Sequence, residues 1–360
     1  MVRNKQGNQT ILFPRKPVIL SAASVVGRKE GNGPLAQWFD IKLEDDTFGE
    51  KTWEKSESKM LKTAMTEALQ KSGKEKNEIG AMLSGDLLNQ LMSSSFMARD
   101  LHIPFLGMYG ACSTMTESLM LGAVLTDGQY SNNVMIGASS HYCTAERQFR
   151  MPLEHGNQRP PSAQWTATAA GAMVLSAGGE EKKAVIADGK GNTAAACNVR
   201  VTCGTIGKVI DAGVKDANQM GAAMAPAAVD TLLNHLQDTG RNITYYDMIL
   251  TGDLGYIGKD IALDLLADAG LPKKEVKDRY DDCGAMIFEK EQDTHSGGSG
   301  CGCSASVFAG YVYKRLQRGT LRRVLIMSTG ALLSTVSPFQ GESIPGIAHA
   351  ISLEADEEAK

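Results

Sequence analysis

Apolar and polar residues follow the same order in two separate segments of this chain. In residues 67–88 and 234–255, apolar side chains at helical spacing lead to a glycine, and a short polar loop then precedes an apolar strand. Both strands end in Gly-Asp-Leu, at residues 85–87 and 252–254, which lie 167 positions apart. The pattern predicts a helix and a strand in each segment and indicates an internal duplication.

A second pair of segments extends the duplication. Each segment begins with Cys-Ser, at Cys112 or Cys303, continues with helical spacing and reaches a glycine 16 residues later. Both then enter an apolar strand, "NVMIGAS" in the first copy and "RVLIMSTG" in the second. We expect the first helix to begin near Ser113 or Thr114, with Thr114 and Glu117 forming a capping box.

A repeated order of helices and strands predicts an α/β protein with mostly parallel sheets that are covered on both faces. We divide the chain into halves at residues 1–180 and 181–360, and interpret residues 30–56 as an insertion that covers one face. Two alanine-rich stretches, "QWTATAAGAMVL" and "MGAAMAPAAVDTLL", are expected to be helices packed closely between the layers.

Composition excludes several classes of function. The net charge is −4 and there is no run of Lys or Arg, so we expect no nucleic-acid partner. The sequence shows neither a signal peptide nor a stretch long enough to span a bilayer. Seven cysteines, an odd number, indicate free thiols, and their spacing favours no metal site.

Cys112 stands between an apolar strand and the start of a helix. Free N–H groups and the helix dipole at such a junction lower the pKa of a thiol, and they also suit a bound carboxylate. Alternatively, Cys112 is a small buried residue that packs where the strand meets the helix. Position alone leaves these readings open, but the matching Cys303 of the second copy favours a functional role.

The strand–Ala-Cys-Ser–helix junction inside a duplicated α/β chain resembles the thiolase superfamily, which includes ketoacyl synthases. Segments such as "GDLLNQ", "IPFLGMYGACSTM", "SSHYCTAERQFR", "DDCG", "GGSGCGCSA" and "ESIPGIAH" resemble, in order, the stage V sporulation protein AD family of spore-forming bacteria. The resemblance covers nearly the whole chain. It implies a five-layered αβαβα fold, built from the two duplicated halves.

The same resemblance implies a function and partners. The family binds dipicolinic acid and takes part in its uptake into the developing spore. We therefore expect dipicolinate as ligand, with calcium left open, and other stage V sporulation membrane proteins as partners. A homodimer is expected by analogy with thiolase-like proteins, and association with the spore inner membrane would be peripheral, through the partners. No cofactor is expected.

Working thiolase-like enzymes need a cysteine nucleophile and two polar partners, His/His or His/Asn, which activate the thiol and hold the carbonyl oxygen. By the resemblance Cys112 occupies the nucleophile position, but Asp253 stands where the first histidine is needed. Ser299 or Cys301 stands at the second partner position, and His295 is a nearby substitute. These departures favour a scaffold that binds a ligand without catalysing a reaction.

A dicarboxylate needs cations and hydrogen-bond donors. The segment after the last strand of the first copy offers His141, Arg147 and Arg150, of which His141 is the preferred candidate. The alternative for both arginines is a surface position, with Arg147 paired to an acid. The predicted ligand-binding set also includes Cys112, Asp253, Ser299 and Cys301. The competing hypothesis is an active acyltransferase or condensing enzyme that uses Cys112 and coenzyme A or acyl-carrier thioesters.

Overall fold

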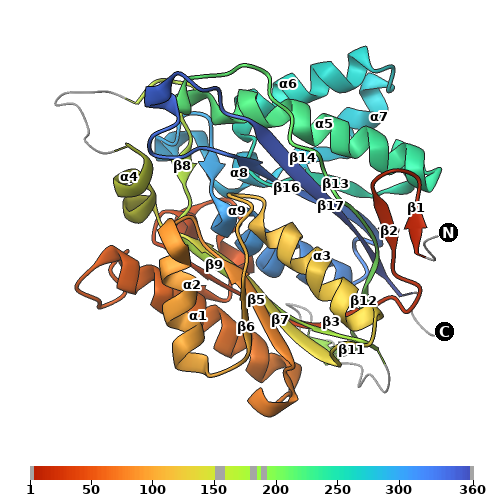
Figure 1. Ribbon diagram of the computed structural model, residues 1–360. Coiled ribbons are helices and arrows are strands. Elements are labelled where there is room, and N and C mark those ends of the chain that lie inside the picture. The colour runs from red at the N-terminus through yellow and green to blue at the C-terminus, as the bar shows by residue number, and fades with distance from the viewer. Residues whose placement is uncertain (1–3, 151–158, 179–184, 188–192, 357–360) are drawn as a thin grey trace.

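The computed structural model describes residues 4–150, 159–178, 185–187 and 193–356. Its central sheet follows the strand order β14-β13-β16-β17-β12-β3-β9-β7-β5-β6 (Figure 1). The first half of the chain supplies β3 (Val18–Val26), β5 (Ala81–Gly85), β6 (Phe105–Gly107), β7 (Asn133–Ser140) and β9 (Ala169–Ser176). The second half supplies β12 (Val199–Thr205), β13 (Met248–Thr251), β14 (Tyr280–Asp282), β16 (Arg323–Ala331) and β17 (Gly346–Ala355).

The strand order reads the same from both ends, as the duplication predicts. β5 and β13 are the strands of the repeated segments 67–88 and 234–255. β7 and β16 are the strands that follow the helices beginning after Cys112 and Cys303. The two sets of five strands meet at β3 and β12, which pair through only two residue pairs, Ile19 with Val199 and Val18 with Arg200. Short strands lie outside this path: β1 (Lys5–Gln6), β2 (Thr10–Leu12), β4 (Ile41–Lys42), β8 (Trp165–Thr166), β10 (Val185–Ala187), β11 (Thr193–Ala195) and β15 (Gly298–Ser299).

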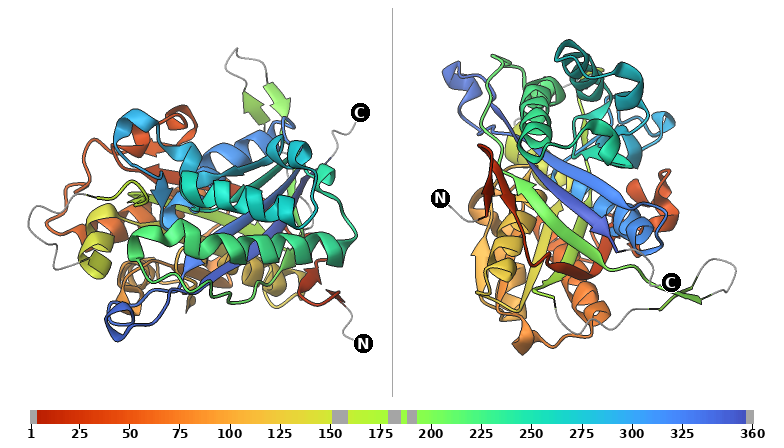
Figure 2. Two further views of the ribbon diagram at one scale, coloured as in Figure 1. Left: turned by 90° about the horizontal axis from the view of Figure 1, so that it is seen from above. Right: turned by 90° about the vertical axis from the view of Figure 1, so that its right-hand side faces the viewer.

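Helices form three layers around these two sets of strands (Figures 1 and 2). α1 (Trp53–Ser72) and α2 (Met92–Leu101) cover the outer side of the first set. α3 (Thr114–Asp127) and the helix formed by α9 (Cys301–Val307), a π-helical turn (Phe308–Val312) and α10 (Tyr313–Gln317) lie in the middle. α5 (Met220–Thr239) and α6 (Gly255–Asp268) cover the second set, with α7 (Lys273–Lys277) and α8 (Cys283–Ile287) beside them. This is the expected five-layered αβαβα fold.

The expectation of mostly parallel strands is wrong. Four neighbouring pairs along the sheet path are parallel, β14–β13, β13–β16, β7–β5 and β5–β6. The other five are antiparallel, because β9 in one half and β17 in the other run opposite to both of their neighbours, and β3 and β12 are antiparallel where the two halves meet.

One of the two alanine-rich stretches is also not a helix. "MGAAMAPAAVDTLL" lies in α5, but "QWTATAAGAMVL" forms β8 and β9. β9 is central in its half and is packed on both faces, by α1 and by α9. A Cβ on Gly171 would lie 2.2 Å from the Ala305 carbonyl oxygen. Small side chains are thus needed here for a close approach between a helix and a strand, which outweighs the helix propensity of alanine.

The halves as assigned from sequence meet at residues 180 and 181, which lie outside the described residues.

The segment at 30–56 packs against the helix formed by α9 and α10. The Trp38 ring contacts Tyr311 edge-on at 5.2 Å between centroids, and Lys314 Nζ donates to the Trp38 carbonyl at 2.6 Å. Glu30 of the same segment is fully buried.

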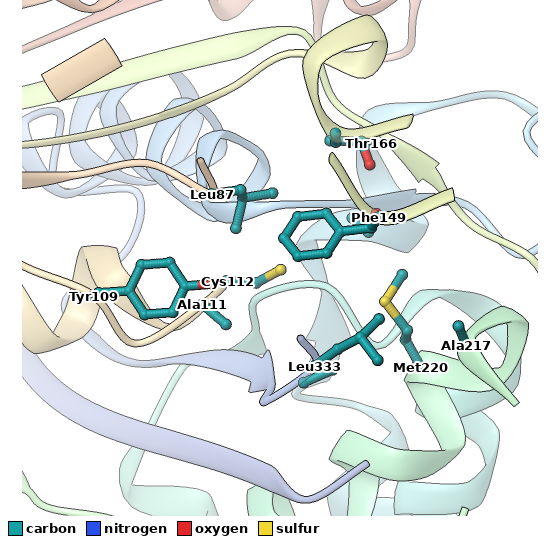
Figure 3. A pocket seen from close by; sticks show the side chains of 12 residues that line it. Leu87, Tyr109, Ala111, Cys112, Phe149, Thr166, Ala217, Met220 and Leu333 are labelled. Carbon is teal, nitrogen blue, oxygen red and sulfur yellow. The ribbon is translucent and has the colours of Figure 1, made fainter. Parts of the chain in front are cut away.

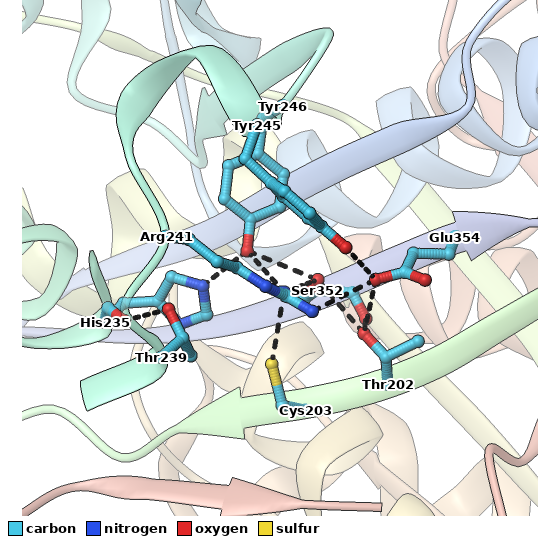
Figure 4. Close-up of polar contacts among 9 residues, drawn as sticks. All are labelled: Thr202, Cys203, His235, Thr239, Arg241, Tyr245, Tyr246, Ser352 and Glu354. Carbon is cyan, nitrogen blue, oxygen red and sulfur yellow. Dashed lines mark hydrogen bonds and ion pairs between the residues drawn. The ribbon is translucent and has the colours of Figure 1, made fainter. Parts of the chain in front are cut away.

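A network of polar side chains joins the C-terminal end of α5 to the sheet (Figure 4). Arg241 Nη1 donates to Tyr246 Oη at 2.8 Å and to Ser352 Oγ at 2.9 Å, and its Nη2 pairs with Glu354 at 3.1 Å. His235 Nε2 lies 2.5 Å from the Tyr246 hydroxyl. These bonds hold the outer helix against β17 and β12.

Candidate functional site

A cavity lies where the two halves meet, and Cys112 is in its wall. Its cavity volume is about 40 Å³, and it is partly open to solvent. Figure 3 shows the side chains of Phe149, Met220 and Leu333 around the Cys112 sulfur. Both halves contribute to the wall: Tyr109, Thr166 and Phe149 come from the first half, and Met220, Ser299 and Leu333 from the second. The described wall contains no Lys, Arg or His.

The backbone before α3 aims Cys112 into this cavity. Ala111 has a positive φ of 51°, which is uncommon for a residue with a side chain and turns the chain sharply between β6 and α3. Thr114 Oγ1 donates to the Ala111 carbonyl at 2.7 Å, and Ser113 Oγ donates to the Gly110 carbonyl at 2.7 Å. The helix begins at Thr114 as expected, but the predicted capping box is wrong, because the Thr114 hydroxyl is used by the turn that precedes it.

Asp253 faces the Cys112 thiol from the end of β13. Its Oδ1 accepts from Thr329 Oγ1 at 2.6 Å and its Oδ2 accepts from the Gly300 N–H at 2.9 Å. Burial raises the pKa of Asp253 to about 6, although these hydrogen bonds lower it. Burial, followed by the charge of Asp253, raises the pKa of Cys112 well above its ordinary value. The expectation that the helix start lowers the pKa of this thiol is therefore wrong.

This arrangement determines what the thiol can do. A nucleophilic cysteine must be a thiolate, which a neighbouring base or cation stabilises. Cys112 has a buried carboxyl beside it instead, and among the residues that the structure describes no histidine lines the cavity. A carboxylate also cannot donate a hydrogen bond to an oxyanion. The site is thus arranged for a neutral thiol.

The two residues predicted at the second partner position have different roles. Ser299 lines the cavity and pairs with Thr166 across the parallel strands β15 and β8. Cys301 is fully buried, and its thiol donates to the Ser139 carbonyl at 2.9 Å. Burial raises the pKa of Cys301 well above its ordinary value, so this thiol is a neutral structural donor.

The structure places His141, the preferred carboxylate-binding candidate from the sequence, outside the described cavity wall. His141 Nδ1 accepts from the Cys143 N–H at 3.1 Å, so Nε2 carries the proton and donates to the Asp46 carbonyl at 2.8 Å. The ring packs against Trp53, 5.5 Å between centroids. Burial lowers the pKa of His141, which keeps it neutral.

Arg147 lies in α4 (Tyr142–Arg150), the helix that also carries the cavity residues Ala145 and Phe149. Its side chain is 54% exposed and forms an ion pair with Glu54, so it does not line the cavity. This is the surface alternative considered for Arg147. The side chain of Arg150 lies outside the described part of the structure.

His295, the substitute considered for the second partner position, and Lys208 both lie outside the described cavity wall. His295 Nδ1 lies 2.8 Å from the Pro160 carbonyl and its Nε2 lies 3.2 Å from Asp293. Lys208 is exposed. Within the described residues, no three His, Cys, Asp or Glu side chains are grouped so that they could hold a metal ion.

Sequence reasoning missed two polar wall residues, Tyr109 and Thr166, and the aromatic wall. Tyr109, Thr166 and Ser299 line the cavity, and none of their hydroxyls forms a hydrogen bond to another described residue. Burial raises the pKa of Tyr109 to about 12, so its hydroxyl stays a donor. Tyr109 could have been found from its place three residues before Cys112, whereas Thr166 and Phe149 reach the site only through the fold.

Fold and site together define a thiolase-like protein whose central thiol has a carboxyl partner. Solved structures with this fold include 3-oxoacyl-[acyl-carrier-protein] synthase III from Aquifex aeolicus, at 11% identity, TM-score 0.53, and coverage of 94% of this chain and 99% of that one. An OleA variant from Xanthomonas campestris matches at 12% identity and TM-score 0.58, covering 95% and 99%. Human mitochondrial 3-ketoacyl-CoA thiolase in complex with CoA matches at 12% identity and TM-score 0.56, covering 96% and 99%.

The particular family follows from closer similarity. The family model of stage V sporulation protein AD matches residues 7–354. Stage V sporulation protein AD of Bacillus subtilis (strain 168) is 41% identical over 348 residues, which are 97% of each chain. The chain therefore belongs to the stage V sporulation protein AD family, a family of sporulation proteins. Among the helices of the described part, none combines the length and apolar character needed to cross a membrane.

Proposed function

We propose that this protein binds dipicolinate in the cavity beside Cys112 and acts in its uptake into the developing spore, without catalysing acyl transfer. The observation that carries the proposal is the pairing of Cys112 with Asp253. A thiol held neutral by a buried acid cannot serve as the nucleophile of a condensing enzyme. Both halves of the chain contribute to the wall of the cavity around it, and this supports a binding role.

The wall chemistry suits a planar aromatic dicarboxylate. Phe149, Leu87, Met220 and Leu333 offer apolar surface to the faces of a pyridine ring. The unbonded hydroxyls of Tyr109, Thr166 and Ser299 are donors for carboxylate oxygens.

Helix dipoles replace the missing cations. Three cavity residues lie at or just before helix starts: Cys112 precedes α3, Met220 begins α5 and Ser299 precedes α9. The partial positive charge at helix N-termini favours an anion placed between them.

Calorimetric titration of the purified chain with dipicolinate tests this proposal. Isophthalate, which has the same two carboxylates but no ring nitrogen, and benzoate, which has one carboxylate, serve as comparison ligands. We expect saturable binding of dipicolinate that weakens at least tenfold in Tyr109→Phe, because one hydrogen bond to a charged group is lost. Tyr130→Phe is the matched control, since Tyr130 is 80% exposed and lies outside the cavity wall.

The competing acyltransferase is tested on the same preparation. Incubation with an acetyl- or malonyl-coenzyme A thioester, followed by mass spectrometry of the intact chain, should leave Cys112 unmodified. An acyl adduct on Cys112 that disappears in Cys112→Ala would contradict the proposal. Partner proteins of the spore membrane and a homodimer belong to the same proposal, and the oligomeric state is measurable by light scattering.

A further inference from the structure

Asp253 is an acid that the fold leaves without a counter-charge. Its side chain is 1% exposed, and no Lys, Arg or His among the described residues forms an ion pair with it. Its two oxygens accept from neutral donors, which are the Thr329 hydroxyl, the Gly300 N–H and the Cys112 thiol. Hydrogen bonds of this kind stabilise an ionised carboxylate but do not cancel its charge.

The groups that face Asp253 from each neighbouring element are neutral or acidic. The start of α3 contributes the Cys112 thiol, and β16 contributes the Thr329 hydroxyl. The turn before α9 contributes the Gly300 amide, and α9 contributes the thiols of Cys301 and Cys303. The segment from β14 into α8 contributes the Asp282 carboxyl group and the Cys283 thiol. An anion in the cavity would therefore add a second negative charge near Asp253, with no cation among these groups.

When a carboxylate binds close to a buried carboxyl group, the two negative charges disfavour joint ionisation and raise the pKa of one of them. Cys112 lies in the cavity wall and against Asp253 at the same time, so its side chain brings the two charges near each other. We propose that the site binds its carboxylate ligand together with one proton, which is held on the Asp253 carboxyl group. This inference rests on the proposed function and names Asp253 as the residue that sets the charge state of the bound pair.

The local geometry accepts both protonation states. With Asp253 ionised, Thr329 Oγ1 donates to Oδ1. A proton on Oδ1 reverses this bond, because a threonine hydroxyl can accept as well as donate. The Gly300 N–H continues to donate to Oδ2 in either state. Protonation therefore requires no rearrangement of the backbone. Burial has already raised the pKa of Asp253 to about 6 before a ligand binds.

The test is calorimetry of dipicolinate binding at about pH 7.5 in phosphate and in Tris, whose ionisation enthalpies differ. Because free dipicolinate is a dianion at this pH, a difference in binding heat between the buffers counts the protons taken up from solution. We expect close to one proton per ligand. We also expect the affinity to fall about tenfold for each unit of pH above the pKa of free Asp253.

Three variants assign the proton. Asp253→Asn should bind dipicolinate with neither proton uptake nor the pH slope, since the amide imitates the neutral acid. Thr329→Val should move the onset of the slope to higher pH, because the ionised form loses a hydrogen bond. Asp281→Asn, which removes a nearby acid that is paired with Lys259 outside the site, should keep the wild-type slope.

The outcomes separate the two proposals. Binding to the wild type without proton uptake overturns this inference and leaves the proposed function standing. Proton uptake that persists in Asp253→Asn also overturns it, because the proton would then reside on the ligand or on another group. Absence of binding at every pH overturns the proposed function and this inference with it.

Discussion

The Cys112 thiol lies against the Asp253 carboxyl group, although the two residues belong to different halves of the duplicated chain. In the first copy the residue equivalent to Asp253 is Asp86, which accepts from the backbone N–H groups of Leu88 and Ser94 at 2.8 and 2.7 Å. The aspartate of the Gly-Asp-Leu motif thus accepts hydrogen bonds from the following backbone in the first half and faces the Cys112 thiol in the second. The chemistry of the site depends on this second placement.

Removing the charge of Asp253 should make Cys112 more reactive. In Asp253→Asn, the pKa of the thiol falls because the neighbouring negative charge is gone, and a larger fraction is thiolate at about pH 8. We expect alkylation of Cys112 by iodoacetamide to be at least several-fold faster than in the wild type, measured by peptide mass spectrometry. The rate at Cys143, which is outside the cavity wall, is the internal control, and equal acceleration at both cysteines would indicate loosened structure instead.

Stability should decrease as the pH rises from about 6 to about 8. Burial raises the pKa of Glu30 to about 8, and burial, followed by the charge of Asp86, raises the pKa of Glu57. Between the unfolded pKa of 4.5 and the folded value, the folded state binds more protons than the unfolded state, so raising the pH favours unfolding. Urea unfolding across this range should show the decrease, and Glu30→Gln should flatten it. Glu44→Gln, at an exposed acid, should leave the wild-type slope.

Stability should also decrease at acidic pH, through buried histidines. Burial lowers the pKa of His235 to about 3 and that of His349 to about 4. Below about pH 6.5 the unfolded state gains protons at these residues while the folded state does not, so the free energy of unfolding falls. The same urea series should therefore show a maximum near pH 6, and His349→Gln should weaken the acidic decrease. A monotonic profile from about pH 4 to 8 would contradict this balance.

Loss of Arg241 should destabilise the attachment of α5 to the sheet. Arg241→Ala leaves the Tyr246 and Ser352 hydroxyls and the Glu354 carboxylate without their cationic donor. We expect the free energy of unfolding to fall by about 2–3 kcal/mol, since several hydrogen bonds to a charged group in a partly buried site are lost together. Arg99→Ala is the control, because Arg99 is 65% exposed and should change stability by less than about 0.5 kcal/mol.

A methyl group added at Gly171 of β9 should push the strands of the first half away from the middle helix layer. In Gly171→Ala the new Cβ would lie 2.2 Å from a backbone oxygen of α9, so the strand or the helix must move. We expect a loss of about 1–3 kcal/mol in the free energy of unfolding. Gly31→Ala is the matched change where the nearest atom is a lysine side chain at 3.3 Å, and it should cost less than 1 kcal/mol by the same principle.

The sequence predicted the duplicated helices and strands because their signals are local. Gly73 and Gly240 end α1 and α5 in the left-handed conformation that glycine favours, and apolar strands follow at the expected places. The stretch at 164–175 was wrongly predicted to be a helix because its many alanines have high helix propensity. The deciding factor is instead α9, a helix from the other half of the chain that packs on this strand. Contacts of this kind are not visible in a local pattern.

The candidate site was predicted in part, for a similar reason. Cys112 and Asp253 are brought together because each follows a strand of the central sheet, whereas Ser299 ends β15, which pairs with β8 outside the central sheet. His141 and Arg147 follow a strand as well, but the direction of their side chains depends on partners such as Asp46 and Glu54, which are distant in sequence. Pattern reasoning places a residue on an element and does not determine which way its side chain points.

The two five-strand sets share only two residue pairs, at β3 and β12. The cavity wall is divided between the two halves of the chain, with Tyr109 and Thr166 from the first and Met220 and Leu333 from the second. A molecule held there would contact both halves. Occupancy would in this way add contacts between the halves to those that β3, β12 and the middle helices already make.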